Sequence, residues 1–364
     1  MANHKILVIG ASSEGALPES YARAFERQGM EVVRFDSERA LMQANRFSSN
    51  RILRRVLRSD SWNTVNREVT EVAKHVRPGL IFAVKCSFFH PETVRQIRNS
   101  VGVPFVNHYP DHPYIGIRWD PREASALRRD LIEVLRQYTI VFMWEKSLVE
   151  RLRRDGVEAK YLTFAVDPEL FRPQPAGEGL HCEICGRRHE VVFVGTRTRA
   201  RQKEIHCIAR HEVAIWGNGW TSGRRGATPG QRIHAPVYAA SVAKIYGAAA
   251  VSLNVLNAEN LGGPNMRTFE VPGSGGVMLA RYSEAQAEFF PENEAAAFYR
   301  SPEELDAKID WLLGDAALRE RIRRNALRLA ASETYDHRAA EVLRQVGLTA
   351  PRRATVSSLV VPPR

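Results

Sequence analysis

Residues 253–280 carry the most specific chemical pattern in the chain. A strand is expected first, a Gly-Gly-Pro turn follows at residues 262–264, and a short helix is expected to begin near Asn265. The N-terminus of a helix presents unpaired backbone N–H groups and a positive dipole end, which together favour phosphate. Arg267 adds a fixed charge in the first turn, and Glu270 could accept two hydrogen bonds from ribose hydroxyls. The alternative is a glycine-rich helix cap with a surface Arg–Glu pair worth about 0.3 kcal/mol.

A second polar loop, residues 107–113, follows another expected strand and reads Asn-His-Tyr-Pro-Asp-His-Pro. Ligands of open parallel sheets bind at the carboxyl ends of the strands, so this loop should face a cleft. Asp111 or His108 could act there as a general base or orient a hydroxyl group. A polar surface loop in which Asp111 caps the following turn explains the pattern equally well.

The glycine loop from Gly10 to Gly15 also follows a strand, and Asp36 ends the next one. It lacks the Gly-x-Gly-x-x-Gly spacing of dinucleotide-binding loops, because position 12 is Ser12 and the next glycine is Gly15. A strand-to-helix turn that needs small residues accounts for this loop, although it can still line a cleft.

Cys182 and Cys185 have the spacing of half a zinc site and are flanked by His181 and His189. His181 is badly placed as a ligand because it adjoins Cys182 directly. A hairpin turn with reduced cysteines is the competing interpretation. In either case, we expect the protein's activity to need no metal. With only four cysteines in the chain, a disulfide-stapled fold is not expected.

Short apolar strands alternate with helical segments along most of the chain, a rhythm typical of parallel sheets covered by helices on both faces. The proline-rich stretch after residue 165 divides two such series. We therefore predict an α/β fold with two doubly wound, Rossmann-like domains facing a central cleft. The predicted boundaries are 1–165 for the N-terminal acceptor-side domain, 166–190 for a linker, 191–348 for the donor-binding domain and 349–364 for a mobile tail.

Composition limits the classes of protein that remain. The 364 residues are 44% hydrophobic and 26% charged, which excludes general disorder and collagen-like repeats. No apolar stretch approaches the ~20 residues of a membrane span, and the N-terminus has no signal-peptide pattern, so a cytoplasmic location is expected. The net charge of +11 indicates anionic partners. A basic amphipathic segment from Arg46 to Arg58 could touch an anionic membrane or simply pack its apolar stripe.

The segment from Asn254 through Arg267-Thr-Phe-Glu270 to Leu279 resembles the donor-site segment of the spore-maturation-type (CgeB-like) glycosyltransferases, a GT-B group related to family 4. Phe164-Ala-Val-Asp-Pro-Glu-Leu-Phe171 is similar to the interdomain signature of that group. Val192-Phe-Val-Gly195, with Arg201 six residues later, resembles the opening of its second domain. The resemblance spans roughly residues 5–345.

The resemblance implies a role for several side chains. Glu270 would bind the donor ribose, Arg267 and the backbone near Asn265 the diphosphate, and Arg201 or Lys203 the same phosphates from the opposite loop. Further donor-binding residues are expected at Gly195, Trp216 and Asn254, with Trp216 near the nucleobase. The chain departs from the family pattern at Gly262, where a glutamate is usual, so the contact to the sugar is missing or made by Glu259 or Asn260.

The resemblance therefore predicts a metal-independent glycosyltransferase that uses a nucleotide-diphosphate-sugar as co-substrate and has no cofactor. Its partners would be the nucleotide sugar and an unidentified acceptor, with no nucleic acid. Two alternatives stay open. One is a sugar-nucleotide epimerase on the same fold, and the other is a non-catalytic protein that binds nucleotide sugars or nucleic acid.

Overall fold

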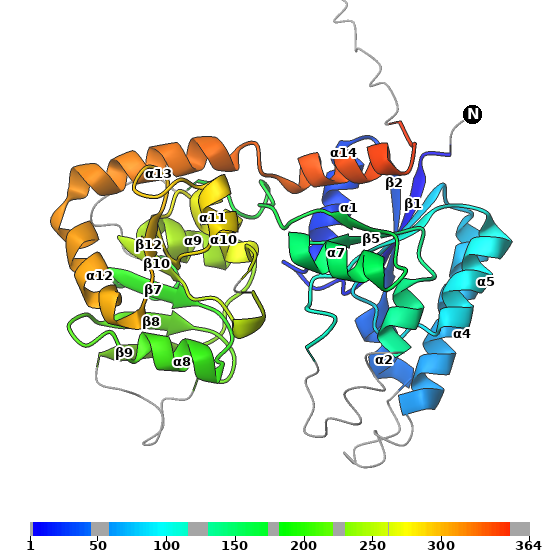
Figure 1. The fold of residues 1–364 in the computed structure, drawn as a ribbon, viewed down its shortest axis with the longest axis horizontal. Helices are drawn as coiled ribbons and strands as arrows, with labels where there is room; N and C mark the ends of the chain where they lie inside the picture. Colours follow the sequence, from blue (N-terminus) through cyan, green and yellow to red (C-terminus); the bar gives the residue numbers. More distant parts are fainter. Residues whose placement is uncertain are drawn as a thin grey trace, which may run out of the picture.

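The N-terminal half is built on a parallel six-stranded sheet in the order β2-β1-β3-β4-β5-β6 (Figure 1). The computed structural model describes residues 3–44, 58–115, 130–173, 182–220, 230–260 and 262–349. Most of these strands are apolar runs buried on both faces, as expected of a sheet covered by helices on both sides. The strands are β1 (Lys5–Gly10), β2 (Glu31–Asp36), β3 (Leu80–Val84), β4 (Phe105–His108), β5 (Ile140–Met143) and β6 (Ala159–Tyr161), and the helices are α1 (Leu17–Arg27), α2 (Ser37–Ala44), α4 (Arg58–Val76), α5 (Pro91–Val101) and α7 (Lys146–Arg154).

The C-terminal half repeats this architecture with a second parallel sheet in the order β12-β11-β10-β7-β8-β9. Its strands are β7 (Val191–Val194), β8 (Val213–Trp216), β9 (Gln231–His234), β10 (Val251–Asn254), β11 (Met278–Arg281) and β12 (Ala297–Tyr299). Its helices are α8 (Arg199–Ile205), α9 (Ala240–Ala248), η1 (Ala258–Asn260), α10 (Met266–Gly273), α11 (Glu284–Phe289), η2 (Pro302–Glu304), α12 (Leu305–Gly314) and α13 (Ala316–Ala330). The prediction of two doubly wound α/β domains is confirmed.

The chain crosses between the domains twice, and the two crossing segments lie side by side. The Val166 N–H donates to the Glu333 carbonyl over 2.9 Å, and the Tyr335 N–H donates to the Val166 carbonyl over 3.0 Å. After the second crossing, α14 (Tyr335–Gln345) packs on α1 of the N-terminal domain (Figure 1). Helix α14 falls within the range 191–348 predicted for the donor-binding domain but contacts the N-terminal domain. Its buried face, which includes Ala339 and Val342, is covered by the first domain.

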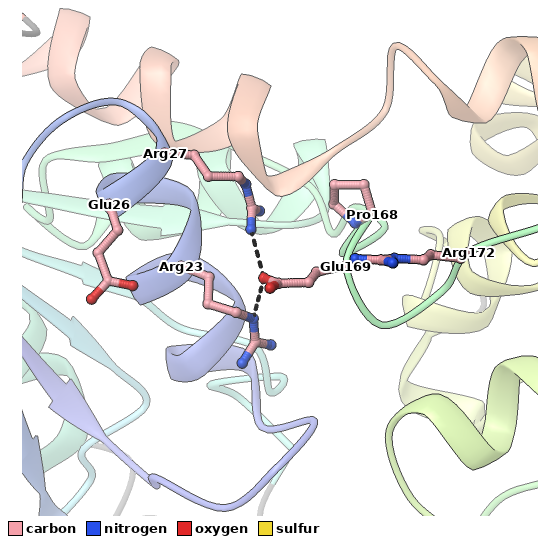
Figure 2. A pocket seen from close by; sticks show the side chains of 6 residues that line it. All are labelled: Arg23, Glu26, Arg27, Pro168, Glu169 and Arg172. Atoms are coloured by element: carbon pink, nitrogen blue, oxygen red, sulfur yellow. Dashed lines mark hydrogen bonds and ion pairs between the residues drawn. The ribbon is translucent and has the colours of Figure 1, made fainter.

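Ion pairs fasten α1 to both crossing segments. Arg23 donates to the buried Asp167 carboxylate over 2.6 Å, and Arg27 pairs with Asp336 at 2.6 Å and with Glu169 at 3.1 Å. Figure 2 shows both arginines directed at Glu169 beside a pocket of about 520 Å³. Because its charges already have partners, this pocket is a weaker candidate for an anionic ligand than the cleft described below.

Two predicted features lie wholly or mostly outside the described residues. The basic segment from Arg46 to Arg58 coincides with residues 45–57, and the C-terminal tail with residues 350–364. Among the helices that are described, none combines the length and apolar character needed to cross a membrane.

Candidate functional site

A cleft of about 500 Å³ lies between the two sheets, within the size range of ligand-binding pockets. Its walls come mainly from loops that follow the carboxyl ends of β1, β4, β7, β8, β9 and β10, and from the start of α10. In each sheet the strand order reverses next to the first strand, between β1 and β3 and between β7 and β10. Open α/β sheets bind ligands at such switch points. The lining residues include 14–15, 110–112, 194–196, 217–218, 236–239, 259–260, 265–267 and 270.

Helix α10 starts at the cleft because Asn265 caps it. The Asn265 Oδ1 accepts the backbone N–H of Thr268 over 3.1 Å, and the Thr268 hydroxyl accepts the Asn265 N–H in return. The Asn265 Nδ2 also donates to the Asn254 Oδ1 over 2.8 Å, and the Asn254 Nδ2 donates to Gln286 over 3.0 Å. This buried network fixes the N-terminus of α10, whose first-turn N–H groups have no carbonyl partner inside the helix. Asn254 itself is fully buried, so it positions the helix and does not line the cleft.

Arg267, in the first turn of α10, lines the cleft, and Arg201 is buried near it without lining the cleft. The Arg267 Nε donates to the Val194 carbonyl over 2.5 Å, while Arg201 donates to the carbonyls of Val255 and Thr196. Within the described residues neither forms a salt bridge with a carboxylate. Burial, followed by the charge of Arg267, lowers the pKa of Arg201 to about 9. Two such neighbouring guanidinium groups favour an anion in the cleft.

Glycines let the backbone approach these groups closely. A Cβ at Gly195 would lie 2.1 Å from the Arg267 Nη2, and a Cβ at Gly263 would lie 2.7 Å from the Trp144 ring of the N-terminal domain. Any larger residue at Gly195 would therefore displace Arg267. Because Gly263 has no side chain, the loop before α10 can pack against the N-terminal domain.

Glu270 lines the same cleft one helical turn after Arg267. Its carboxylate forms no hydrogen bond with any described residue, and the side chain keeps partial contact with solvent. Burial raises the pKa of this carboxyl group to about 7, and the Arg267 charge opposes the shift only in part. Ligand groups that donate hydrogen bonds to this buried carboxylate would stabilise its charged form.

The opposite wall carries Asp111, which is ion-paired to Lys85 at 2.7 Å. Burial alone would lower the pKa of Lys85, but the hydrogen bond and charge of Asp111 raise it. Lys85 and Cys86 both have positive φ, 63° and 51°, which costs non-glycine residues of order 1 kcal/mol or more each. This strained turn after β3 places the Lys85 ammonium beside Asp111.

His108 does not face the cleft, contrary to our expectation. Its ring is fully buried, its Nδ1 lies 2.8 Å from the Tyr21 hydroxyl, and the ring stacks on Phe164. Burial, with a smaller contribution from Arg338, lowers the pKa of His108 to about 3, so the ring stays neutral. The neighbouring His112 lines the cleft instead, and its Nδ1 accepts the Tyr114 N–H over 3.2 Å.

Two predicted donor-binding side chains also lie elsewhere. Lys203 is exposed on α8 and does not line the cleft. Trp216 is buried with its ring stacked on His234, 4.4 Å between centroids, so the backbone of Gly217 and the side chain of Asn218 face the cleft in its place.

Other cleft residues include Glu14, from the glycine loop that the sequence allowed to line a cleft, and Tyr238, which carries no recognisable sequence signal. Glu14 comes from the loop after β1, and Tyr238 follows the edge strand β9. The Tyr238 side chain is 61% exposed and its hydroxyl accepts a hydrogen bond from Asn218 over 3.0 Å. Glu259 and Asn260, named as substitutes for the acid missing at Gly262, do line the cleft. Across the described ranges, no three of the His, Cys, Asp and Glu side chains are grouped to hold a metal ion as they stand.

Comparisons with known proteins agree with this geometry. Residues 197–344 match the sequence model of a family described as glycosyl transferase-like. Anabaena HepE in complex with UDP-glucose is 13% identical, with a TM-score of 0.63 over 94% of this chain and 99% of that one. Sucrose-phosphate synthase from Thermosynechococcus elongatus is 12% identical, with a TM-score of 0.68 over 94% and 99%. A glycosyltransferase from Rickettsia africae is 11% identical, with a TM-score of 0.62 over 95% and 99%.

Residues 197–344 thus resemble the glycosyl transferase-like family, and the chain shares the two-domain GT-B fold of these structures. A comparison with curated proteins found no match to the chain.

Proposed function

We propose that the chain transfers a sugar from a nucleoside-diphosphate sugar to an acceptor held by the N-terminal domain. The observation that carries this proposal is that Arg267, in the capped first turn of α10, and the nearby Arg201 pair with no carboxylate of the described residues. In this proposal Arg267 and the first-turn N–H groups of α10 bind the diphosphate, and Arg201 adds charge from below. Glu270 accepts hydrogen bonds from the ribose hydroxyls.

During the reaction the bond between the anomeric carbon and the diphosphate oxygen breaks, and a bond from that carbon to an acceptor oxygen forms. Negative charge grows on the leaving diphosphate, and the arginines and the helix N-terminus stabilise it without a metal ion. Asp111 is the proposed base that takes the proton of the acceptor hydroxyl. The ion pair with Lys85 holds the Asp111 carboxylate in place at the cleft wall.

We also propose a donor class and a subgroup for the chain. HepE binds UDP-glucose, which makes UDP-sugars the first donors to test. The segment 254–279 supports membership of the spore-maturation-type (CgeB-like) group within the GT-B transferases.

A thermal-shift screen of UDP, GDP, ADP and TDP tests the donor site. A nucleotide at 100 times its dissociation constant stabilises the folded protein by about 2.7 kcal/mol. We expect one nucleotide to do so in the parent protein and in Arg324→Ala, whose side chain is exposed on α13, but not in Arg267→Ala. Tight binding of an oligonucleotide with no response to any nucleoside diphosphate would contradict the proposal.

Product analysis with the matching nucleotide sugar then tests transfer. A sugar attached to an acceptor, with one nucleoside diphosphate released per transfer, agrees with a transferase. A donor sugar that changes only its stereochemistry would instead identify an epimerase that uses the same phosphate site.

A further inference from the structure

The hairpin between the first crossing segment and β7 gathers cysteine and histidine side chains away from the cleft. It contains Cys182, Cys185 and His189, and Cys182 pairs with Arg187 in an isolated antiparallel bridge. The cysteines are not joined in a disulfide. An ion pair of 2.7 Å between Glu183 and Lys244 holds the hairpin on α9.

The backbone of this hairpin has the form of a metal-binding knuckle. The N–H groups of Cys185 and Gly186 donate to the Cys182 carbonyl, and Gly186 has a φ of +67°. No atom approaches the position of a Cβ at Gly186, so glycine is needed there for its left-handed backbone alone.

One histidine contacts a cysteine, and a second histidine packs against the first. The His189 Nε2 lies 3.0 Å from the Cys185 sulfur. The ring of His234, at the end of β9, lies 5.4 Å from the His189 ring between centroids, and its Nε2 is buried with no hydrogen-bond partner among the described residues. Two imidazoles that share one tetrahedral zinc ion have ring centres about 5 Å apart, given a Zn–N distance of about 2.0 Å.

We propose that Cys182, Cys185, His189 and His234 bind a structural Zn²⁺ ion. Two thiolates and two imidazoles are the ligand set that zinc prefers, and four protein ligands close the coordination shell. The four side chains do not enclose an ion as they stand, because the hydrogen bond between Cys185 and His189 holds the sulfur and the Nε2 too close together. A sulfur and a nitrogen on one zinc lie about 3.5 Å apart, so binding moves His189 back by about half an ångström.

The ion would fasten the hairpin to the edge of the second sheet. The Trp216 ring stacks on His234 and meets the His189 ring edge-on, with 5.2 Å between the Trp216 and His189 centroids. Trp216 ends β8, and the next two residues, Gly217 and Asn218, line the cleft. The zinc site therefore holds the strand end that carries part of the cleft wall, without contributing to the cleft itself.

Elemental analysis of the full-length protein, purified from zinc-supplemented medium, tests the ion. We expect about one zinc per chain in the parent protein and in Cys207→Ser, whose cysteine lies outside the hairpin. Cys182→Ser and Cys185→Ser should bind zinc at least tenfold more weakly, since even a lost supporting contact costs about 10–100-fold. Zinc content that is low in the parent protein, or a Cys182–Cys185 disulfide found by mass spectrometry, would overturn the proposal.

Cobalt substitution tests the ligand set independently of folding. Co²⁺ in the parent protein and in His206→Ala should show the intense visible absorption of a tetrahedral site with a thiolate charge-transfer band. His234→Ala should lose the tetrahedral bands. Its thermal unfolding, measured without nucleotide, should remain a cooperative transition. An unchanged cobalt spectrum in His234→Ala would overturn the four-ligand site.

Discussion

Replacing Glu270 by glutamine keeps the shape of the side chain and removes its charge. Burial raises the pKa of the folded-state carboxyl from 4.5 to about 7. Between these two values the unfolded chain loses the proton while the folded protein keeps it. The stability of the parent protein therefore falls as the pH rises from about 4.5 to about 7, and stays low above that.

The size of this effect follows from the shift. The full difference in pKa corresponds to roughly 3 kcal/mol, which we reduce to about 1–2 kcal/mol because the side chain keeps some contact with water. Glu270→Gln should thus unfold about 2–6 °C higher than the parent protein at pH 8, with no difference at pH 4. Glu68→Gln, which changes an exposed carboxylate on α4, is the matched control.

As the pH rises, the affinity for the donor should increase, whereas the stability of the folded protein decreases. In the proposed function ribose hydroxyls donate to the carboxylate, so the affinity for UDP-glucose should rise through about pH 7 in the parent protein. Glu270→Gln should lack this rise and bind about 1.5–3 kcal/mol more weakly. Calorimetry in two buffers of different ionisation enthalpy should show about half a proton released at pH 7 by the parent protein only. Equal melting temperatures at pH 8 together with equal affinities would refute the placement of Glu270 in the donor site.

Three further variants test other parts of the structure. Asp111→Asn should leave UDP binding by calorimetry near normal and slow transfer about 100-fold or more, and an equal loss of both would remove Asp111 from the catalytic role. Gly195→Ala should weaken UDP binding at least tenfold because its Cβ would meet Arg267, whereas Gly347→Ala meets no atom and should bind normally. Arg23→Ala leaves the buried Asp167 without its 2.6 Å partner and should lower the free energy of unfolding by about 3 kcal/mol, and an unchanged denaturation midpoint would contradict that.

Much of the fold could be predicted because the strands of a doubly wound sheet are short apolar runs with few ambiguities. The apolar runs at residues 80–84 and 191–194 form the strands β3 and β7. The edge strand β9 has no such signal, because Gln231–His234 contains one apolar residue and an edge strand needs little apolar surface.

The sequence by itself determined the start of α10 and the places of Arg267 and Glu270. Once Asn265 caps the helix, the helical spacing sets where the next residues lie relative to its N-terminus. Only the tertiary structure decided which strand-end side chains reach the cleft. Successive side chains of a strand point to opposite faces, and His108 and Trp216 fall on the covered faces while His112 and Asn218 fall in the loops beyond. His234 stacks on Trp216 only because β9 pairs beside β8, a contact between distant segments that local spacing does not contain.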